Sequence, residues 1–330
     1  MYTTNDILKI FQMSNTQKSS ILSAEKKLEI PVAEKIARGS IKVRQWKSED
    51  LPVIGKKFGY LKSPGGQKVI SVYTPKGGVT KTTLSANLGR MLAFNGIKTM
   101  LVGLDFQRSL TRYIVPEHYN ASNIEELSRD QGAGLHHILF ENKSIEEVVL
   151  KTDLPTLDII PETSDLNFMS KKIRLQNRRE YLFGDKLLEK LKDYEVVIFD
   201  CNPGWNDLTE NALVASNNVI MPLACEIECY EALQANISEI VEYQREMRLD
   251  WSNFLMTPSL LENTAMSQAI YKQYVSLYQD NIIAFPTRRA VIAQEARVNH
   301  KSIIEYAPKS SIANDYYNMV KSLWGEIANV

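Results

Sequence analysis

Cysteine and histidine are scarce in this sequence, and long apolar runs are missing. Three cysteines and four histidines occur in 330 residues. An odd number of thiols, so few in a chain of this length, excludes a disulfide framework and indicates a reducing compartment. Cys225 and Cys229 are spaced like metal ligands, but no nearby histidine or further cysteine completes a four-ligand site, so we expect these thiols and Cys201 to be buried. The lack of an 18-residue apolar run and of a signal peptide predicts a cytoplasmic protein.

An excess of charge of one sign is also lacking, because 39 Lys and Arg residues balance 39 Asp and Glu residues. The balance is uneven along the chain. Residues 1–68 carry 13 basic and 6 acidic side chains, which gives this block a net charge of +7 and residues 69–330 one of −7. A basic block on an acidic body predicts an anionic partner, most often nucleic acid. A solvated basic face is the alternative.

After residue 68, short apolar runs alternate with amphipathic stretches. Short β-branched runs of this kind are typical of strands that are buried on both faces of a parallel sheet. The sequence therefore predicts an α/β fold with a doubly wound, mostly parallel sheet. The predicted strands are 69–74, 99–104, 157–160, 196–200, 218–223, 253–257 and 281–285, and the predicted helices include 81–95, 164–192, 229–248 and 263–278.

The stretch YTPKGGVTKTTLSANLG, residues 73–89, joins the first strand to the first helix of this region. A phosphate-binding loop usually reads G-x-x-x-x-G-K-[ST], and Lys81 and Thr82 match its end. Pro75 and Thr80 occupy the places of the two usual glycines. A strand, a tight turn and a helix in this order point backbone N–H groups at one place, which favours phosphate. Lys81 is therefore predicted to reach the phosphates and Thr82 to bind Mg²⁺.

The glycines of this loop stand at 77 and 78 and follow a second lysine, Lys76, which gives the pattern K-G-G-x-x-K-[ST]. This pattern resembles the deviant Walker A loop of the ParA/MinD family of P-loop ATPases. The resemblance implies ATP and Mg²⁺ as cofactors and a homodimer that forms with ATP, in which Lys76 touches the partner subunit's nucleotide. The nucleotide site that it implies consists of Lys76, Gly77, Gly78, Val79, Thr80, Lys81, Thr82, Thr83 and Asp200.

The segment MLVGLDFQRS, residues 100–109, resembles the D-x-D-x-Q segment of the same family. Asp105 matches the carboxylate that orients the attacking water, and Gln107 lies beside it in the sequence. Gly103 stands where the family has its first aspartate, and Phe106 stands where proline is usual. The missing carboxylate puts the hydrolysis rate in question more than nucleotide binding.

The segment YEVVIFDCNPGWNDLTENAL, residues 194–213, resembles the Walker B strand of these ATPases and the loop after it. Asp200 at the strand end is expected to bind Mg²⁺ through water, beside the Thr82 hydroxyl. A strand-terminating aspartate without that role is the alternative. The expected catalytic residues are Lys76, Lys81 and Asp105.

Two later segments, residues 217–233 and 285–317, also resemble ParA proteins, so the resemblance covers most of 69–330. The second segment interleaves basic and apolar residues. In ParA dimers, basic residues of this region bind DNA without sequence preference. The resemblance implies this role for Arg288, Arg289, Arg297 and Lys301, and ordinary surface charges are the alternative.

The N-terminal block has the pattern of two short helices, capped by Thr4 and Ser14 and joined by the turn QMSN. This is the size of a helix-turn-helix. Residues 33–46 could form a basic β-wing with Gly39 at its tip.

The run R-x-W-x-x-x-D-L, residues 44–51, resembles the end of the wing in MerR-type winged helix-turn-helix domains. The expected domains are this DNA-binding domain at 1–62, a linker at 63–68 and the ATPase domain at 69–330. A small cap that packs on the ATPase is the alternative for the first of these. The candidate DNA contacts of the block are Lys18, Lys35, Arg38, Lys42 and Arg44.

These resemblances together imply a DNA-partition ATPase. Its ATP-bound dimer would bind DNA on the nucleoid, and a ParB-type partner would stimulate hydrolysis and release it. The N-terminal domain would add operator binding.

Three other functions compete with partition. A MinD-like ATPase at the membrane surface needs a basic amphipathic C-terminal helix. Residues 316–330 carry one lysine and one glutamate, so a packed helix is the better explanation and no membrane partner is expected. An iron–sulfur carrier needs clustered cysteines, which the chain lacks. A transcription regulator with an inert ATPase domain remains open because of Gly103.

Overall fold

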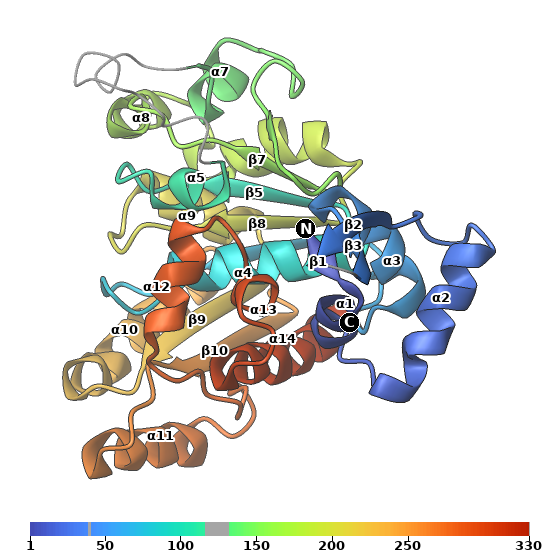
Figure 1. Ribbon diagram of the computed structural model, residues 1–330. Helices are drawn as coiled ribbons and strands as arrows, with labels where there is room; N and C mark the ends of the chain where they lie inside the picture. The colour runs from blue at the N-terminus through green and yellow to red at the C-terminus, as the bar shows by residue number, and fades with distance from the viewer. Residues whose placement is uncertain (39–40, 116–131, 330) are drawn as a thin grey trace, which may run out of the picture.

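The computed structural model describes residues 1–38, 41–115 and 132–329 of the chain (Figure 1). The centre of the molecule is a seven-stranded sheet with the strand order β10-β9-β4-β8-β5-β7-β6. All neighbouring strands are parallel except β6, which pairs antiparallel with β7 at one edge. The predicted doubly wound, mostly parallel sheet is confirmed. Its strands are β4 (Lys68–Val72), β5 (Thr99–Gly103), β6 (Leu150–Lys151), β7 (Leu157–Ile160), β8 (Val196–Asp200), β9 (Asn218–Ala224) and β10 (Asn253–Ser259).

Helices cover both faces of this sheet because its strands are apolar on both sides. In β8, Ile198 faces one hydrophobic cluster, while Val197 and Phe199 face another. The first cluster includes α4 (Lys81–Phe94), α5 (Ser109–Ile114), α12 (Val291–Val298), α13 (Ile303–Tyr306) and α14 (Ser311–Ala328). The second includes α7 (Leu135–Phe140), α8 (Leu166–Ile173), α9 (Asp207–Ala215), α10 (Ile227–Glu246) and α11 (Ala265–Leu277).

The strand predicted at 281–285 is wrong. Only a single bridge forms there, between Met256 of β10 and Ile282. The N–H of Phe285 bonds to the carbonyl of Ile283 at 2.8 Å, so the chain turns tightly just after the bridge. The N–H of Thr287 then donates to the carbonyl of Pro258 in β10 at 3.0 Å, so the turn interrupts the pairing with β10 and no continuous ladder forms.

The single helix predicted at 164–192 is also wrong. It ends at Ile173, the last residue of α8, and Arg178 adopts a left-handed conformation with φ of 51°. A non-glycine residue in that conformation cannot continue a right-handed helix. The rest of the stretch forms short turns of 3₁₀ and π helix at 179–181, 183–187 and 188–191.

The N-terminal block contains the expected helices and hairpin, together with a two-residue strand. A capping box at Thr3 and Asp6, and not Thr4, starts the first helix. Ser14 begins a 3₁₀ turn that leads into the second helix. Gly39, expected at the wing tip, lies outside the described residues. The elements are β1 (Tyr2–Thr3), α1 (Thr4–Ile10), α2 (Lys18–Lys26), β2 (Glu34–Arg38), β3 (Ile41–Trp46) and α3 (Leu51–Phe58), with a sheet order β1-β3-β2.

This block is docked on the rest of the chain beside α4 and α14 (Figure 1). The rings of Phe11 and Phe94 meet edge to face at 5.7 Å between centroids. Side chains of the block and of residues 69–329 belong to one continuous hydrophobic cluster. The N-terminal block is therefore packed against the α4 face of the sheet and does not hang from a free linker.

The apolar face of α14 is buried, as expected for a packed C-terminal helix. Its buried residues include Met319, Val320, Leu323, Trp324 and Ile327. The indole N–H of Trp324 donates to the carbonyl of Lys62 at 2.8 Å. No helix among the described residues is long and apolar enough to cross a membrane.

Candidate nucleotide-binding site

The loop between β4 and α4 folds as a tight turn at the carboxyl end of the sheet. Gly78 has a φ of 79°, and Thr80, which caps α4, has a φ of 72°. Two left-handed residues so close together bend the chain and turn the N-terminus of α4 toward the loop. A Cβ atom built on Gly77 or Gly78 would meet nothing within 4 Å, so a ligand can approach the backbone there.

The ammonium group of Lys81 lies inside this loop. It donates to the carbonyls of Thr74 at 3.1 Å and of Lys76 at 2.6 Å, and the residue is only 8% exposed. Burial lowers the pKa of Lys81, and the negative charge of Asp200 opposes this shift. A buried cation at a helix N-terminus is an electrostatic partner for phosphate.

The carboxylate of Asp200 lies below the first turn of α4. It accepts hydrogen bonds from the hydroxyls of Thr82 and Ser85, both at 2.7 Å. The residue is fully buried, and burial raises the pKa of Asp200 to about 6. The sequence prediction brought Thr82 and Asp200 together but missed Ser85. Its signal was a hydroxyl three residues after Thr82, on the same helix face.

A cavity of about 420 Å³ opens over the loop, within the usual range for small-molecule sites. Loop residues 77–83 form one wall, and Asp105, which follows β5, also lines the cavity. Lys76 is partly exposed and is not among the lining residues. Gln107 is exposed, and its N–H donates to Asp105 Oδ1 at 3.0 Å. The cavity thus collects most of the loop residues, while Lys76 lies outside it.

The oxygen atoms of Thr82 and Asp200 are the kind of ligand that Mg²⁺ prefers. Together with the open backbone at Gly77 and the ammonium of Lys81, they fit a magnesium–nucleotide complex.

The AAA_31 family model, described as an AAA domain, matches residues 67–252, which is more than half of the chain. This chain belongs to the ParA/Soj-like family of P-loop ATPases. The sporulation initiation inhibitor protein Soj of Bacillus subtilis is 28% identical over 257 residues, or 78% of this chain and 98% of that protein. The chromosome partitioning protein ParA of Caulobacter vibrioides is 28% identical over 261 residues, or 78% of this chain and 93% of that protein.

Solved structures share the fold of this ParA/Soj-like chain. One, from Borrelia burgdorferi B31 and described as a plasmid partition protein bound to AMPPNP, has a TM-score of 0.65 at 21% identity and covers 79% of this chain and 100% of its own. Cobyrinic acid a,c-diamide synthase from Mycobacterium smegmatis, with a bound ATP analogue and magnesium, has a TM-score of 0.57 at 26% identity. It covers 70% of this chain and 91% of its own. The N-terminal block lies outside the region that the family model matches.

Three of the four basic residues that the resemblance implies as DNA contacts lie at the nucleotide cavity. Arg288, Arg289 and Arg297 all line that cavity. Arg288 pairs with Asp315 at 2.6 Å, and Arg289 pairs with two glutamates. Lys301 is held by an ion pair with Asp153 and by the Ser48 hydroxyl. Of these four, Arg297 alone is exposed without an ion pair among the described residues.

In the N-terminal block, Lys18, at the start of α2, is exposed, as are Lys35 and Lys42 on the β2–β3 ribbon. Arg44 bonds through Nε to the nearly buried carboxylate of Glu25 at 3.0 Å. This contact ties the ribbon to α2. The backbone of Arg38 lies in β2, opposite residue 41.

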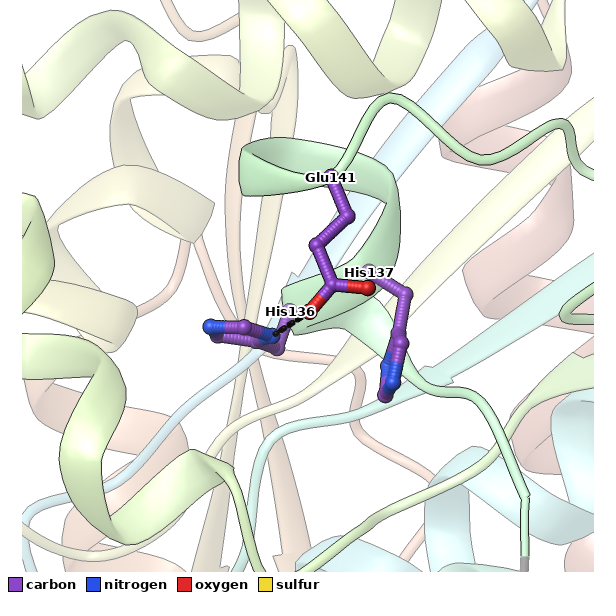
Figure 2. A group of neighbouring side chains, drawn as sticks. All are labelled: His136, His137 and Glu141. Atoms are coloured by element: carbon purple, nitrogen blue, oxygen red, sulfur yellow. Dashed lines mark ion pairs between the residues drawn. The ribbon is translucent and has the colours of Figure 1, made fainter.

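A second group of polar side chains lies at α7, away from the loop (Figure 2). Ligand atoms of His136, His137 and Glu141 lie within 4.8 Å of one another. However, Lys172 Nζ lies 2.6 Å from Nε2 of His136. A lysine ammonium only donates, so the ring proton belongs on Nδ1, the atom that faces Glu141 at 3.5 Å. In this arrangement neither ring nitrogen of His136 has a free lone pair for a metal ion, although Nδ1 itself makes no hydrogen bond. The three cysteines are buried and free, as expected.

Proposed function

We propose that this chain is a DNA-partition ATPase. It dimerises with ATP, binds DNA without sequence preference in that state, and is released when a ParB-type partner stimulates hydrolysis. The observation that supports this most is the convergence of Lys81, Thr82 and Asp200 at the first turn of α4. Relatives that match 78% of this chain over nearly their whole length carry the names chromosome partitioning protein ParA and Soj.

Each of four residues around the cavity has a chemical task in this proposal. Lys81 neutralises the β- and γ-phosphates, and the loop N–H groups hold their oxygens. Thr82 binds Mg²⁺ directly, and Asp200 binds it through water. Asp105, at the edge of the cavity, orients the attacking water.

Lys76 has a different task, because it does not line its own chain's cavity. Its side chain is partly exposed next to the loop. We assign it to the nucleotide of a second copy of the chain, so that dimerisation and ATP binding are linked.

The N-terminal block contributes a DNA contact in this proposal. In the hairpin register, Lys35 lies opposite Arg44 and Ala37 opposite Lys42. Because side chains alternate along a strand, these residues share one face of the ribbon, which makes that face basic. A basic ribbon of this kind meets phosphates and gives affinity with little specificity. Lys18, at the start of α2, is the candidate for reading a base edge.

The test compares two lysines of the loop by analytical ultracentrifugation with ATP and Mg²⁺. Lys81→Ala is expected to lose nucleotide binding and dimers together. Lys76→Ala should keep nucleotide binding in the monomer but lose the ATP-dependent dimer. Lys272→Ala, an exposed lysine on α11, is the matched control and should behave as wild type.

Dimers of Lys76→Ala as tight as those of wild type would contradict the cross-subunit role. Nucleotide binding without turnover, even with DNA and a stimulating partner, would favour a transcription regulator with an inert ATPase domain. ATP-dependent flotation with liposomes would favour the MinD-like alternative, against which the buried apolar face of α14 already argues.

A further inference from the structure

A buried glutamate stands at the place that Gly103 leaves open. Gly103 ends β5, and its register partner in β8 is Asp200. Residues in register on neighbouring strands direct their side chains to the same face. A side chain at 103 would therefore lie beside the Asp200 carboxylate.

Glu162 occupies that space. A Cβ atom built on Gly103 would lie 2.2 Å from Cγ of Glu162, 2.6 Å from Cδ and 3.0 Å from Oε1. Such distances are far shorter than any real contact, so residue 103 can carry no side chain while Glu162 stays where it is. The carboxyl group comes from just after β7, the next strand along the sheet.

The two carboxyl oxygens of Glu162 differ in their hydrogen bonds. Oε2 accepts hydrogen bonds from the N–H of Thr111 at 2.8 Å and from its hydroxyl at 3.0 Å. Oε1 is buried without a partner, in a residue that is 2% exposed. An unpartnered buried oxygen is costly, so its presence calls for an explanation. Thr111 therefore supplies the hydrogen bonds of Oε2, while Oε1 has none.

We infer that Glu162 is a positioning residue of the nucleotide site, which supplies from β7 the carboxyl group that Gly103 cannot supply from β5. Its Oε1 accepts a hydrogen bond from the water shell of the cation held at Thr82 and Asp200. Burial raises the pKa of Glu162 to about 8, and the charges of Asp200 and Asp105 add to this, so a nearby divalent cation would favour its ionised form. The inference rests on the proposed function, because it presumes a magnesium–nucleotide complex in the cavity.

The test measures the Mg²⁺ dependence of nucleotide binding with a fluorescent ADP analogue, which needs neither hydrolysis nor a partner protein. Glu162→Gln keeps an oxygen for Thr111 but loses the charge. Affinity in Mg²⁺ should fall by about 10–100-fold, the usual effect of losing an outer-shell partner, while affinity in EDTA stays unchanged.

Two further variants separate this role from a structural one. Asp158→Asn changes another buried carboxylate, on β7 itself, that also has one unpartnered oxygen, and it should leave the Mg²⁺ dependence unchanged. Gly103→Asp alone should be poorly folded because of the clash with Glu162. Gly103→Asp combined with Glu162→Ala returns a carboxylate to β5 and should recover most of the lost Mg²⁺-dependent affinity.

If Glu162→Gln binds like wild type in Mg²⁺, this inference is wrong while the proposed function stands. If Asp158→Asn loses as much affinity as Glu162→Gln, the effect is a general one of buried charge, and the inference is again wrong. If wild type binds no nucleotide, the proposed function fails and the inference fails with it.

Discussion

The buried carboxylate of Asp200 has an energetic cost that a bound cation would remove. A buried carboxylate is unfavourable unless hydrogen bonds or charges offset its desolvation. Two hydroxyls at 2.7 Å, from Thr82 and Ser85, supply part of that offset, yet the pKa of Asp200 is still raised to about 6. A divalent cation nearby would remove the remaining cost, so the site gains stability when it is loaded.

Glu162 gives the pH dependence of the unloaded protein a definite sign. Its pKa in the folded chain, about 8, lies above the ordinary value of 4.5, so the folded state binds this proton more tightly than the unfolded state does. Its contribution to stability is complete below pH 4.5 and is lost as pH rises through 8. Glu162→Gln removes this contribution.

The free energy of unfolding of Glu162→Gln, relative to wild type, should therefore rise between pH 6 and pH 9. The maximum slope for one group is about 1.4 kcal/mol per pH unit. Urea unfolding in EDTA at several pH values measures it. A constant difference between the two proteins across that range would contradict the assignment.

At the level of residues, the sequence predicted the side chains that belong to recognisable motifs, including the meeting of Thr82 and Asp200, and missed those that belong to none. Lys81 and Thr82 follow from the loop pattern, and Asp200 follows from its place at a strand end. Ser85 bonds to Asp200 and Glu162 fills the space beside Gly103, but neither residue belongs to these motifs. Glu162 and Gly103 are 59 residues apart in the sequence. They come close only because β5 and β7 are neighbours in the sheet.

The end of α3 packs closely against the end of α4. A Cβ atom on Gly55 would lie 1.9 Å from the carbonyl oxygen of Phe94. The amide oxygen of Asn95 accepts from the N–H of Tyr60 at 2.8 Å and from that of Leu61 at 3.2 Å. This contact fixes the chain where the N-terminal block ends.

Gly55→Ala is expected to destabilise the protein by about 1–3 kcal/mol, the usual effect of overpacking. The backbone carbonyl of Phe94 cannot move aside without disturbing α4. Gly325→Ala is the matched control, because this glycine also lies in a helix but has open space where its Cβ would be. It should stabilise the protein by about 0.5–1 kcal/mol. Urea unfolding distinguishes the two signs, and equal effects would refute the proposed clash.

Whole elements were predicted well where pattern and packing agree. The central strands are apolar on both faces, so no other local structure competes for them. The run at 281–285 is equally apolar, yet its chain turns after one bridge to β10. The docking of residues 1–62 was only one of two alternatives in the sequence, because single residues carry it, such as Phe11 against Phe94 and Trp324 at the carbonyl of Lys62.

The molecule as a whole joins a basic block to the helix that follows the nucleotide loop. Arg90 of α4 is fully buried and pairs with Glu305, whose carboxylate also accepts from the hydroxyl of Tyr2 at 3.0 Å. The block is thus packed against α4, the helix that follows the nucleotide loop. Removal of residues 1–68 would expose Phe94 and leave that network incomplete, so DNA binding by the block is better tested with point variants in the full chain.

The last prediction concerns the salt dependence of DNA binding. Lys35→Ala combined with Lys42→Ala should reduce the slope of log affinity against log salt by roughly two, because each lost phosphate contact changes it by about 0.9. Both lysines are exposed and make no ion pair among the described residues, so the unfolding free energy should not change. Fluorescence anisotropy with a random duplex at 50–300 mM salt, as approximate working limits, measures the slope.

Two comparisons complete this experiment. Lys272→Ala with Lys321→Ala removes the same charge from α11 and α14 and should leave the slope unchanged. Arg44→Ala should instead lower stability, because it leaves the Glu25 carboxylate without its cation. If the Lys35/Lys42 pair and the Lys272/Lys321 pair change the slope equally, DNA binding depends on the total charge of the chain and not on the ribbon. If neither does, the ribbon does not touch phosphate, and the N-terminal block is a structural cap for the ATPase, with its basic face turned to solvent.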